Sequence, residues 1–166
     1  VLPHGAHTPT PDDVKKGAIA SNALVKKSTE QGEKNFQSQI HYADKLVGKI
    51  VDKIKALGIE KDTYIIYASD NGTTASAKGK GVEYGVHVPF VVAGADVKKR
   101  GMTDELMDFT DLLPTFAELA GTKVPARYNV DGTSMADFLT GKSDHTKDVI
   151  YSFPGPATLV RTKDYM

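Results

Sequence analysis

The stretch Thr63-Tyr-Ile-Ile-Tyr-Ala-Ser-Asp-Asn-Gly72 decides the fold that the rest of this sequence predicts. Its first half is a short apolar run of β-branched and aromatic residues, which is typical of a strand buried on both faces of a sheet. The run stops at Ser69, where polar residues and a glycine force the backbone out of the sheet. We therefore predict a buried strand over 63–69 that delivers polar groups to one edge of the sheet.

Two of those polar residues, Asp70 and Asn71, are candidate metal ligands. In an open α/β sheet, ligands bind in the crevice beyond the carboxyl ends of the strands. A carboxylate and an amide oxygen side by side at that edge suit a divalent cation. The alternative interpretation is a simple turn, because Asn-Gly favours positive φ. The residues alone leave both interpretations open.

Composition excludes several classes of function. The chain has 166 residues, enough for one domain with a real core. Positive and negative residues balance at 21 each, so no overall field attracts nucleic acid or an anionic membrane. The absence of cysteine excludes disulfides, a thiolate zinc site and a cysteine nucleophile within these residues. No apolar run approaches the length of a membrane span. From this and from the balanced charge, we expect neither nucleic acid nor a membrane as a partner.

The two ends of the sequence look cut. The chain starts at Val1 rather than at a methionine, without a recognisable signal peptide. It ends at Met166, just as a predicted strand begins. We expect the chain to be a fragment of a larger protein.

The clearest helix is predicted over 40–57, where apolar residues recur at three- and four-residue steps and Gly58 provides the stop. Residues 14–36 are polar and predict either a loose helix or an exposed loop. The other predicted elements are, in chain order, a strand over 88–93, a helix that starts at Thr103, a new helical turn from Pro114 to Gly121, a short helix over 132–139, and strands over 148–153 and 158–161.

Two loops carry further candidate residues. His4 and His7 follow the apparent end of a strand and are candidate ligands, proton donors or substrate contacts, or else ordinary loop residues. The loop over 73–81 contains small residues, two glycines, Lys78 and Lys80. Its backbone can approach a ligand closely and its lysines can meet an oxyanion. The spacing of a Walker phosphate loop is absent.

Four stretches occur in one order along the chain. They are Leu2-Pro-His4 with Pro9-Thr-Pro-Asp12; Tyr42-Ala-Asp-Lys-Leu-Val-Gly-Lys-Ile50 leading to Asp62-Thr63 and Ser69-Asp-Asn-Gly72; Lys78-Gly-Lys-Gly-Val-Glu83-Tyr-Gly85-Val-His-Val-Pro89; and Asp111-Leu-Leu-Pro-Thr115 through Leu119-Ala-Gly121, then Asp131-Gly-Thr-Ser134. In this order and spacing, the chain resembles the sulfatases of the alkaline-phosphatase-like superfamily over residues 1–13 and 40–166.

The resemblance implies an α/β fold, with a mixed, largely parallel sheet sandwiched by helices. Residues 1–153 would be the carboxyl-terminal part of the catalytic domain, and 154–166 the start of a strand in a carboxyl-terminal subdomain. The implied activity is calcium-assisted hydrolysis of a sulfate ester of a small molecule or a saccharide. The family also implies a periplasmic or secreted location.

The resemblance assigns roles to the candidate residues. Asp70 and Asn71 would be two of the Ca²⁺ ligands, and an asparagine at the second position favours sulfate over phosphate chemistry, because phosphatase relatives usually have histidine there. Lys78 would hold the sulfate oxygens, with Lys80 as the substitute. His4 would contact the sulfate or the leaving group, and His7 competes for that role.

One part of the family's active site is absent from these residues. The family's nucleophile is a formylglycine made from a cysteine or serine in Cys/Ser-x-Pro-x-Arg, and this sequence has no such stretch. Two further aspartate ligands of the calcium belong to the same absent portion. We therefore expect about half an active site, and a sheet edge that either the missing amino-terminal half of the domain or another chain covers. The alternatives are a phosphoryl-transfer relative on the same fold and a non-catalytic metal- or anion-binding fragment.

Overall fold

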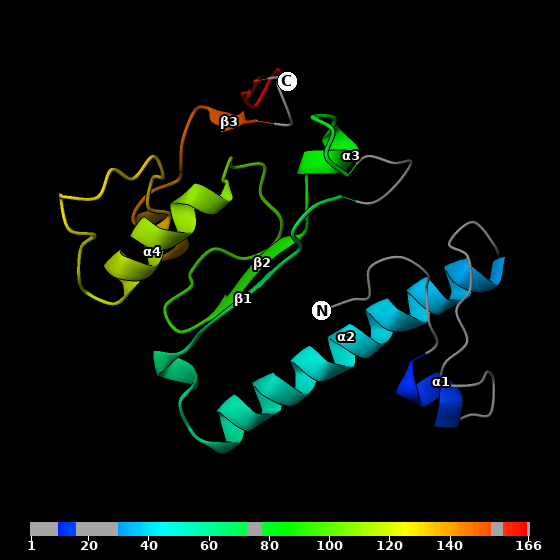
Figure 1. Ribbon diagram of the computed structural model, residues 1–166. Coiled ribbons are helices and arrows are strands. Elements are labelled where there is room, and N and C mark those ends of the chain that lie inside the picture. The colour runs from blue at the N-terminus through cyan, green and yellow to red at the C-terminus, as the bar shows by residue number, and fades with distance from the viewer. Residues whose placement is uncertain (1–9, 16–29, 73–77, 154–157, 166) are drawn as a thin grey trace. The chain divides into compact units, whose positions relative to one another are not determined.

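A computed structural model of the chain describes residues 10–15, 30–72, 78–153 and 158–165 (Figure 1). The chain divides into two compact units, Val1–Ile59 and Glu60–Met166. Among the described helices, none has both the length and the apolar character needed to cross a membrane.

The first unit consists of α1 (Pro11–Lys15) and α2 (Glu30–Ala56). The predicted helix over 40–57 is confirmed, but α2 begins earlier, with acidic residues in its first turn, where the helix dipole favours negative charge. It ends as predicted. Gly58 has a φ of +67° and its N–H donates to the carbonyl of Lys55 at 2.9 Å, which satisfies one of the last free carbonyls of the helix.

The apolar stripe of α2 is only partly covered. Val47, Val51 and Ile54 are half-buried, whereas Ile40 and Ile50 are 47% and 57% exposed. Amphipathic spacing correctly predicted the helix but not how much of its apolar face is enclosed, because burial depends on what packs against that face.

The second unit contains short elements joined by long loops. In chain order they are η1 (Glu60–Asp62), β1 (Tyr64–Ala68), α3 (Glu83–Val86), β2 (Phe90–Gly94), η3 (Phe109–Asp111), α4 (Leu112–Leu119), α5 (Ala136–Leu139), β3 (Ile150–Ser152) and β4 (Leu159–Arg161). The four strands lie within the ranges that the sequence predicted or extend one of them by a single residue, and their existence is confirmed.

The strands form two antiparallel pairs. β1 pairs with β2, from Tyr64 opposite Gly94 to Ala68 opposite Phe90, and β3 pairs with β4 (Figure 1). The mixture of helices and strands agrees with the predicted α/β class. No parallel pair is found in the part of the chain that the structure describes, so the largely parallel sheet stays a prediction.

The prediction that the 63–69 strand is buried on both faces is wrong for the described residues. No residue of β1 is fully buried, and Tyr67 is 40% exposed. The small core of the unit lies elsewhere, around Met135, Phe138 and Leu139, and it takes Phe90 from β2 but no residue from β1. β1 is therefore held by its backbone pairing with β2 more than by side-chain packing.

A second prediction, the helix that starts at Thr103, is also wrong. Residues 102–108 are not helical, and the helical segment begins at η3, whose N-cap is Asp108. The Asp108 side chain accepts the N–H of Thr110 at 2.8 Å, and the side chain of Asp111 accepts the N–H of Asp108 at 2.9 Å. This reciprocal capping box is stronger than the local signal at Thr103. Pro114 lies in the first turn of α4, where its missing N–H costs nothing.

A buried polar joint holds the second unit together. Asp111 is 0% exposed, and its second oxygen accepts the N–H of Thr133 at 2.7 Å. Thr115, also 0% exposed, donates to the carbonyl of Asp111 at 2.6 Å and accepts the N–H of Met135 at 2.9 Å. Between them, a Cβ at Gly132 would lie 2.0 Å from the carbonyl oxygen of Thr110. The stretches 111–115 and 132–135 are therefore held together, because polar groups of each satisfy those of the other.

Lys147 completes this joint. Its side chain is 11% exposed, and its ammonium lies 2.6 Å from Asp111 and 2.9 Å from Asp108. Burial alone would lower the pKa of Lys147, but hydrogen bonds to the two carboxylates outweigh burial and raise that pKa above its ordinary value. The lysine stays charged and joins the segment before β3 to the start of α4.

We expect Asp111→Ala to lower the free energy of unfolding by about 3–5 kcal/mol, because it removes one partner of a buried ion pair and takes the acceptor away from the N–H groups of Asp108 and Thr133. Asp131→Ala is the control, since Asp131 is exposed in the same motif and its loss should cost within about 0.5 kcal/mol. Urea unfolding of both variants measures the difference, and equal losses would contradict the structural role of the joint.

Candidate functional site

β1 ends just before the predicted polar residues. The last backbone hydrogen bond between the β1 and β2 segments runs from the N–H of Ser69 to the carbonyl of Pro89 at 3.2 Å. Ser69 lies one residue beyond the end of β1 at Ala68. Immediately afterwards come Asp70, which is exposed, and Asn71, which is half-buried. The pair therefore lies just beyond the end of the antiparallel β1–β2 pair, where solvent and a ligand have access.

Each of these two side chains keeps one oxygen available. One carboxylate oxygen of Asp70 accepts the N–H of Asn71 at 3.0 Å, and the side-chain amide of Asn71 donates to the carbonyl of Gly72 at 2.9 Å. Within the part of the chain that the structure describes, the other Asp70 oxygen and the amide oxygen of Asn71 accept no hydrogen bond. Local hydrogen bonds orient both groups without consuming their ligand atoms.

This donor set fits part of a calcium site. Calcium takes six to eight oxygen ligands, as carboxylate, amide and backbone oxygens or water. Asp70 and Asn71 supply two oxygens of the right kind. No cluster of three or more histidine, cysteine, aspartate or glutamate side chains occurs among the described residues, so the pair does not form a complete cage there.

The loop that follows the pair returns to it. The N–H of Gly72 donates to the carbonyl of Gly85 in α3 at 3.0 Å. A Cβ at position 72 would lie 1.6 Å from the carbonyl oxygen of Tyr84, so only glycine permits this approach. The chain that leaves Gly72 therefore returns beside Asn71 at Tyr84 and Gly85.

Both predicted oxyanion contacts lie on this closed loop. Lys78 and Lys80 are exposed and flank Gly79, whose φ of +76° turns the backbone between them. The bond between Gly72 and Gly85 returns the segment that carries them to the Asp70–Asn71 pair, and their role as oxyanion contacts stays a prediction. The other two predicted site residues, His4 and His7, lie outside the described residues.

A carboxylate that the sequence did not single out as functional braces the loop. Glu83, the first residue of α3, forms an ion pair with Arg161 of β4 and a hydrogen bond with Nδ1 of His87, the latter at 2.6 Å. The four-residue spacing of Glu83 and His87 on a helix was a usable signal for their pairing. The pairing with Arg161 joins residues 78 positions apart, and no local pattern marks it.

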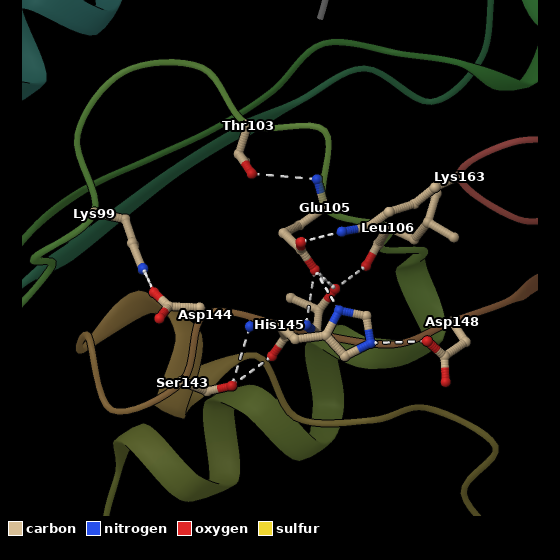
Figure 2. Close-up of polar contacts among 10 residues, drawn as sticks. Lys99, Thr103, Glu105, Leu106, Ser143, Asp144, His145, Asp148 and Lys163 are labelled. Carbon is tan, nitrogen blue, oxygen red and sulfur yellow. Dashed lines mark hydrogen bonds and ion pairs between the residues drawn. The ribbon is translucent and has the colours of Figure 1, made fainter.

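A second polar cluster surrounds Glu105, as Figure 2 shows. One Glu105 oxygen forms an ion pair with Lys163, and the other accepts the N–H of Thr146 and faces Nδ1 of His145, both at 2.9 Å. Nε2 of the same histidine lies 3.1 Å from Asp148. The cluster joins the segment before η3 to the segments before β3 and after β4.

The Glu105 cluster is structural rather than catalytic. The hydrogen bond from Lys163, more than any other contact, lowers the pKa of Glu105 to about 2, against the opposing effect of burial and with help from the N–H of Thr146. A general acid or base needs a pKa near the working pH, so a carboxylate that stays ionised and fully engaged is unsuited to proton transfer. The sequence placed Glu105 in the first turn of a helix and missed its distant partners.

Comparisons with known proteins place the chain in a family. The family model described as Sulfatase matches residues 1–122, which include the Asp70–Asn71 pair and the lysine loop. An ulvan-active sulfatase from Formosa agariphila is 29% identical over 154 residues, which cover 90% of this chain and 30% of that protein. Human N-acetylglucosamine-6-sulfatase is 32% identical over 120 residues, which cover 68% of this chain and 21% of that protein.

Two further relatives agree. Human arylsulfatase A is 29% identical over 143 residues, which cover 78% of this chain and 28% of that protein. An extracellular sulfatase homologue from Drosophila melanogaster is 32% identical over 111 residues, which cover 63% of this chain and 10% of that protein. The chain thus spans less than a third of the length of each of these relatives.

We expect Glu105→Gln to lower the melting temperature by several degrees at neutral pH and by progressively less in acid. The pKa of Glu105 falls from 4.5 to about 2 on folding, so its contribution to stability is present above pH 4.5 and is lost as the pH falls towards 2. Glu118→Gln, at an exposed position of α4, is the control. Thermal unfolding followed from neutral pH to about pH 2 should show the two variants converging, and a pH-independent gap would contradict the assignment.

Proposed function

Because this chain belongs to the sulfatase family, we propose that the protein containing it hydrolyses a sulfate ester to an alcohol and inorganic sulfate. The observation that carries the proposal is the oriented Asp70–Asn71 oxygen pair, with one oxygen of each residue available at the end of β1. The closed lysine loop beside that pair supports it.

Asp70 and Asn71 would hold Ca²⁺ through their available oxygens. When bound, the cation would stabilise negative charge on the sulfate group and on the nucleophile. The chain's own contribution is to keep the two side chains oriented, through the Asn71 N–H on one and the Gly72 carbonyl on the other. Preset oxygens need little reorganisation when the charge develops.

Lys78 would donate hydrogen bonds to the sulfuryl oxygens, with Lys80 as the substitute. A lysine ammonium is a compact charge with three donors, which suits an oxyanion approached from solvent. The role of contacting the sulfate or the leaving oxygen falls to His4 or to His7. The nucleophile, a formylglycine in this family, and two further aspartate ligands would lie outside these residues.

The larger fold is part of the same proposal. We place residues 1–153 in the carboxyl-terminal part of a catalytic domain and 154–166 at the start of a subdomain strand. β1 has a hydrogen-bonded neighbour on one side only among the described residues, and Tyr67 is 40% exposed. Further strands from the rest of the domain, or from another chain, would pair with that edge and complete a mixed, largely parallel sheet.

The substrate class follows from the relatives. One is named an ulvan-active sulfatase and another an N-acetylglucosamine-6-sulfatase, which favours a sulfated saccharide. A further relative is named an extracellular sulfatase, which favours a periplasmic or secreted location for this protein. Phosphoryl transfer and metal or anion binding without turnover are the other outcomes that the experiments below distinguish.

We expect Lys78→Ala in the full-length protein to lower kcat for a sulfate ester by about 10²–10³-fold, the usual cost of removing one donor to a developing oxyanion. Lys80→Ala is the matched control, with the same side chain removed two positions along the same turn, and should change kcat far less. The melting temperature of both variants should stay near that of the unmodified protein. If Lys80→Ala carries the large loss instead, the two lysines exchange roles. A faster turnover of the matching phosphate ester would favour the phosphoryl-transfer alternative.

We expect Asp70→Ala to weaken Ca²⁺ binding to the full-length protein at least about tenfold, because affinity for the cation follows the charge and number of its ligands. Asp96→Ala, at an exposed position after β2, serves as the control. Calorimetric titration of the metal-stripped proteins with CaCl₂ measures the change without relying on turnover. Unchanged affinity in Asp70→Ala would remove this residue from the metal site.

A further inference from the structure

The peptide bond between Asn71 and Gly72, just after β1, joins two residues that can react with each other. The chain has four asparagines, and only Asn71 is followed by glycine, since the others precede Ala23, Phe36 and Val130. In such a pair, the backbone nitrogen of the second residue can attack the side-chain amide carbon of the asparagine. Glycine has no Cβ to obstruct this approach. By sequence, Asn71–Gly72 is therefore the most reactive of the four pairs.

In the structure, hydrogen bonds hold both reacting groups. The N–H of Gly72 donates to the carbonyl of Gly85 at 3.0 Å, and the side-chain amide of Asn71 donates to the carbonyl of Gly72 at 2.9 Å. To attack, the Gly72 nitrogen must lose its proton, and its peptide plane must turn towards the asparagine side chain. The first hydrogen bond therefore holds the nucleophile, and the second holds the group that would leave.

Close packing opposes this turn of the peptide plane. A Cβ at position 72 would lie 1.6 Å from the carbonyl oxygen of Tyr84 and 3.1 Å from the Cα of Gly85. Gly72 is thus packed against the backbone of α3, and a rotation about its bond to Asn71 would have to displace that backbone. The glycine that makes the pair reactive in an unfolded chain also lets the folded chain hold the pair in place.

From this geometry we propose that Asn71 is a deamidation site whose rate is controlled by the contact between Gly72 and Gly85. While the contact is in place, the asparagine is protected. When the chain between the two glycines opens locally, the asparagine becomes reactive. Asn71 is only half-buried, so water reaches the opened site. All of these contacts lie within the second unit, and the reaction is independent of sulfate ester hydrolysis.

The reaction consumes only water. The Gly72 nitrogen gives its proton to water or hydroxide and bonds to the side-chain amide carbon of Asn71. The bond from that carbon to the amide nitrogen breaks, and the nitrogen takes up a proton and leaves as ammonia. Water then opens the resulting cyclic imide at either carbonyl. One opening produces an aspartate, and the other produces an isoaspartate, in which the main chain runs through the former side chain.

Either product changes the end of β1. Both carry a carboxylate at position 71, beside the carboxylate of Asp70, where the native chain has a neutral amide. Isoaspartate also adds one carbon to the main chain at the point where Gly72 has no room to move. We therefore expect the isoaspartate form to lose the hydrogen bond between Gly72 and Gly85.

The test measures the conversion of Asn71 in the folded, full-length protein at mildly alkaline pH. Peptide mapping by mass spectrometry quantifies the conversion, and chromatography separates the aspartate and isoaspartate forms. A synthetic peptide with the sequence of residues 67–76, in the same buffer, gives the rate without the contact. We expect the rate in the protein to be at least about tenfold lower than in the peptide, because opening must break a backbone hydrogen bond and displace Gly72 from α3.

A variant that loosens the contact should speed the reaction. Glu83 joins α3 to Arg161 of β4 through an ion pair whose two side chains are 39% and 32% exposed. Glu83→Ala should therefore raise the conversion rate about two- to fivefold, which corresponds to the usual contribution of a partly exposed ion pair. Glu118→Ala, at an exposed position of α4, is the matched control and should leave the rate unchanged.

Three results would overturn the proposal. Equal rates in the peptide and the folded protein would show that the contact does not protect Asn71. An unreactive peptide would show that the pair is not a deamidation site. Equal rates in Glu83→Ala and Glu118→Ala would show that the attachment of α3 does not control the reaction. The comparison with the peptide needs neither variant to fold, and none of these measurements uses turnover, so an inactive protein would contradict the proposed function alone.

Discussion

The constraint on which the candidate site depends is a contact between two stretches of backbone. Residue 72 runs so close to the carbonyl of Tyr84 that a single Cβ would lie 1.6 Å from its oxygen. Because glycine occupies the position, its N–H reaches the carbonyl of Gly85 and closes the loop that carries the two lysines. The same contact holds α3 at the end of β1, so that Glu83 can reach Arg161. The Asp70–Asn71 pair, the segment with the two lysines and the carboxyl-terminal hairpin thus depend on one position without a side chain.

Carboxylates in the second unit divide into two kinds by what surrounds them. Asp111 and Glu105 are 0% and 9% exposed at the side chain, and their ion pairs with Lys147 and Lys163 join segments far apart in the sequence. Such groups are costly to bury unless they are fully paired, and both are. Asp70 is exposed and keeps one oxygen available beside a backbone N–H that orients the other. Full pairing of a carboxylate with low exposure therefore marks the scaffold here, whereas the candidate site has an oriented, accessible carboxylate.

The sequence correctly predicted the features that a few neighbouring residues determine. Its predictions were wrong where contacts with distant segments determine the structure. The end of β1 before Ser69 and the stop of α2 at Gly58 follow from backbone preferences that a few residues carry, and both are confirmed. The predicted helix start at Thr103 is wrong because Asp108 is a better N-cap. In addition, Glu105, close to Thr103 in the sequence, binds segments far along the chain. The predicted burial of β1 is wrong for a related reason. An apolar strand pattern shows that a strand can be buried, but not which segments cover it. Asp70 and Asn71 could be proposed as metal ligands because they are adjacent in the sequence, and that role stays a prediction.

The incomplete ligand set and the exposed strand have a common explanation. Two oxygens are too few for calcium, which takes six to eight, and an apolar strand with one paired edge leaves backbone groups open to another strand. In the proposed site both deficits occur at the same place, because Asp70 follows the end of β1 at Ala68 by two residues. In an open sheet, the strand next to β1 would present its own carboxyl end beside Asp70, and any carboxylate there would face the same cation. Completing the sheet and completing the metal site are then one structural event, and relatives more than three times as long as the matched region have the additional chain to supply it.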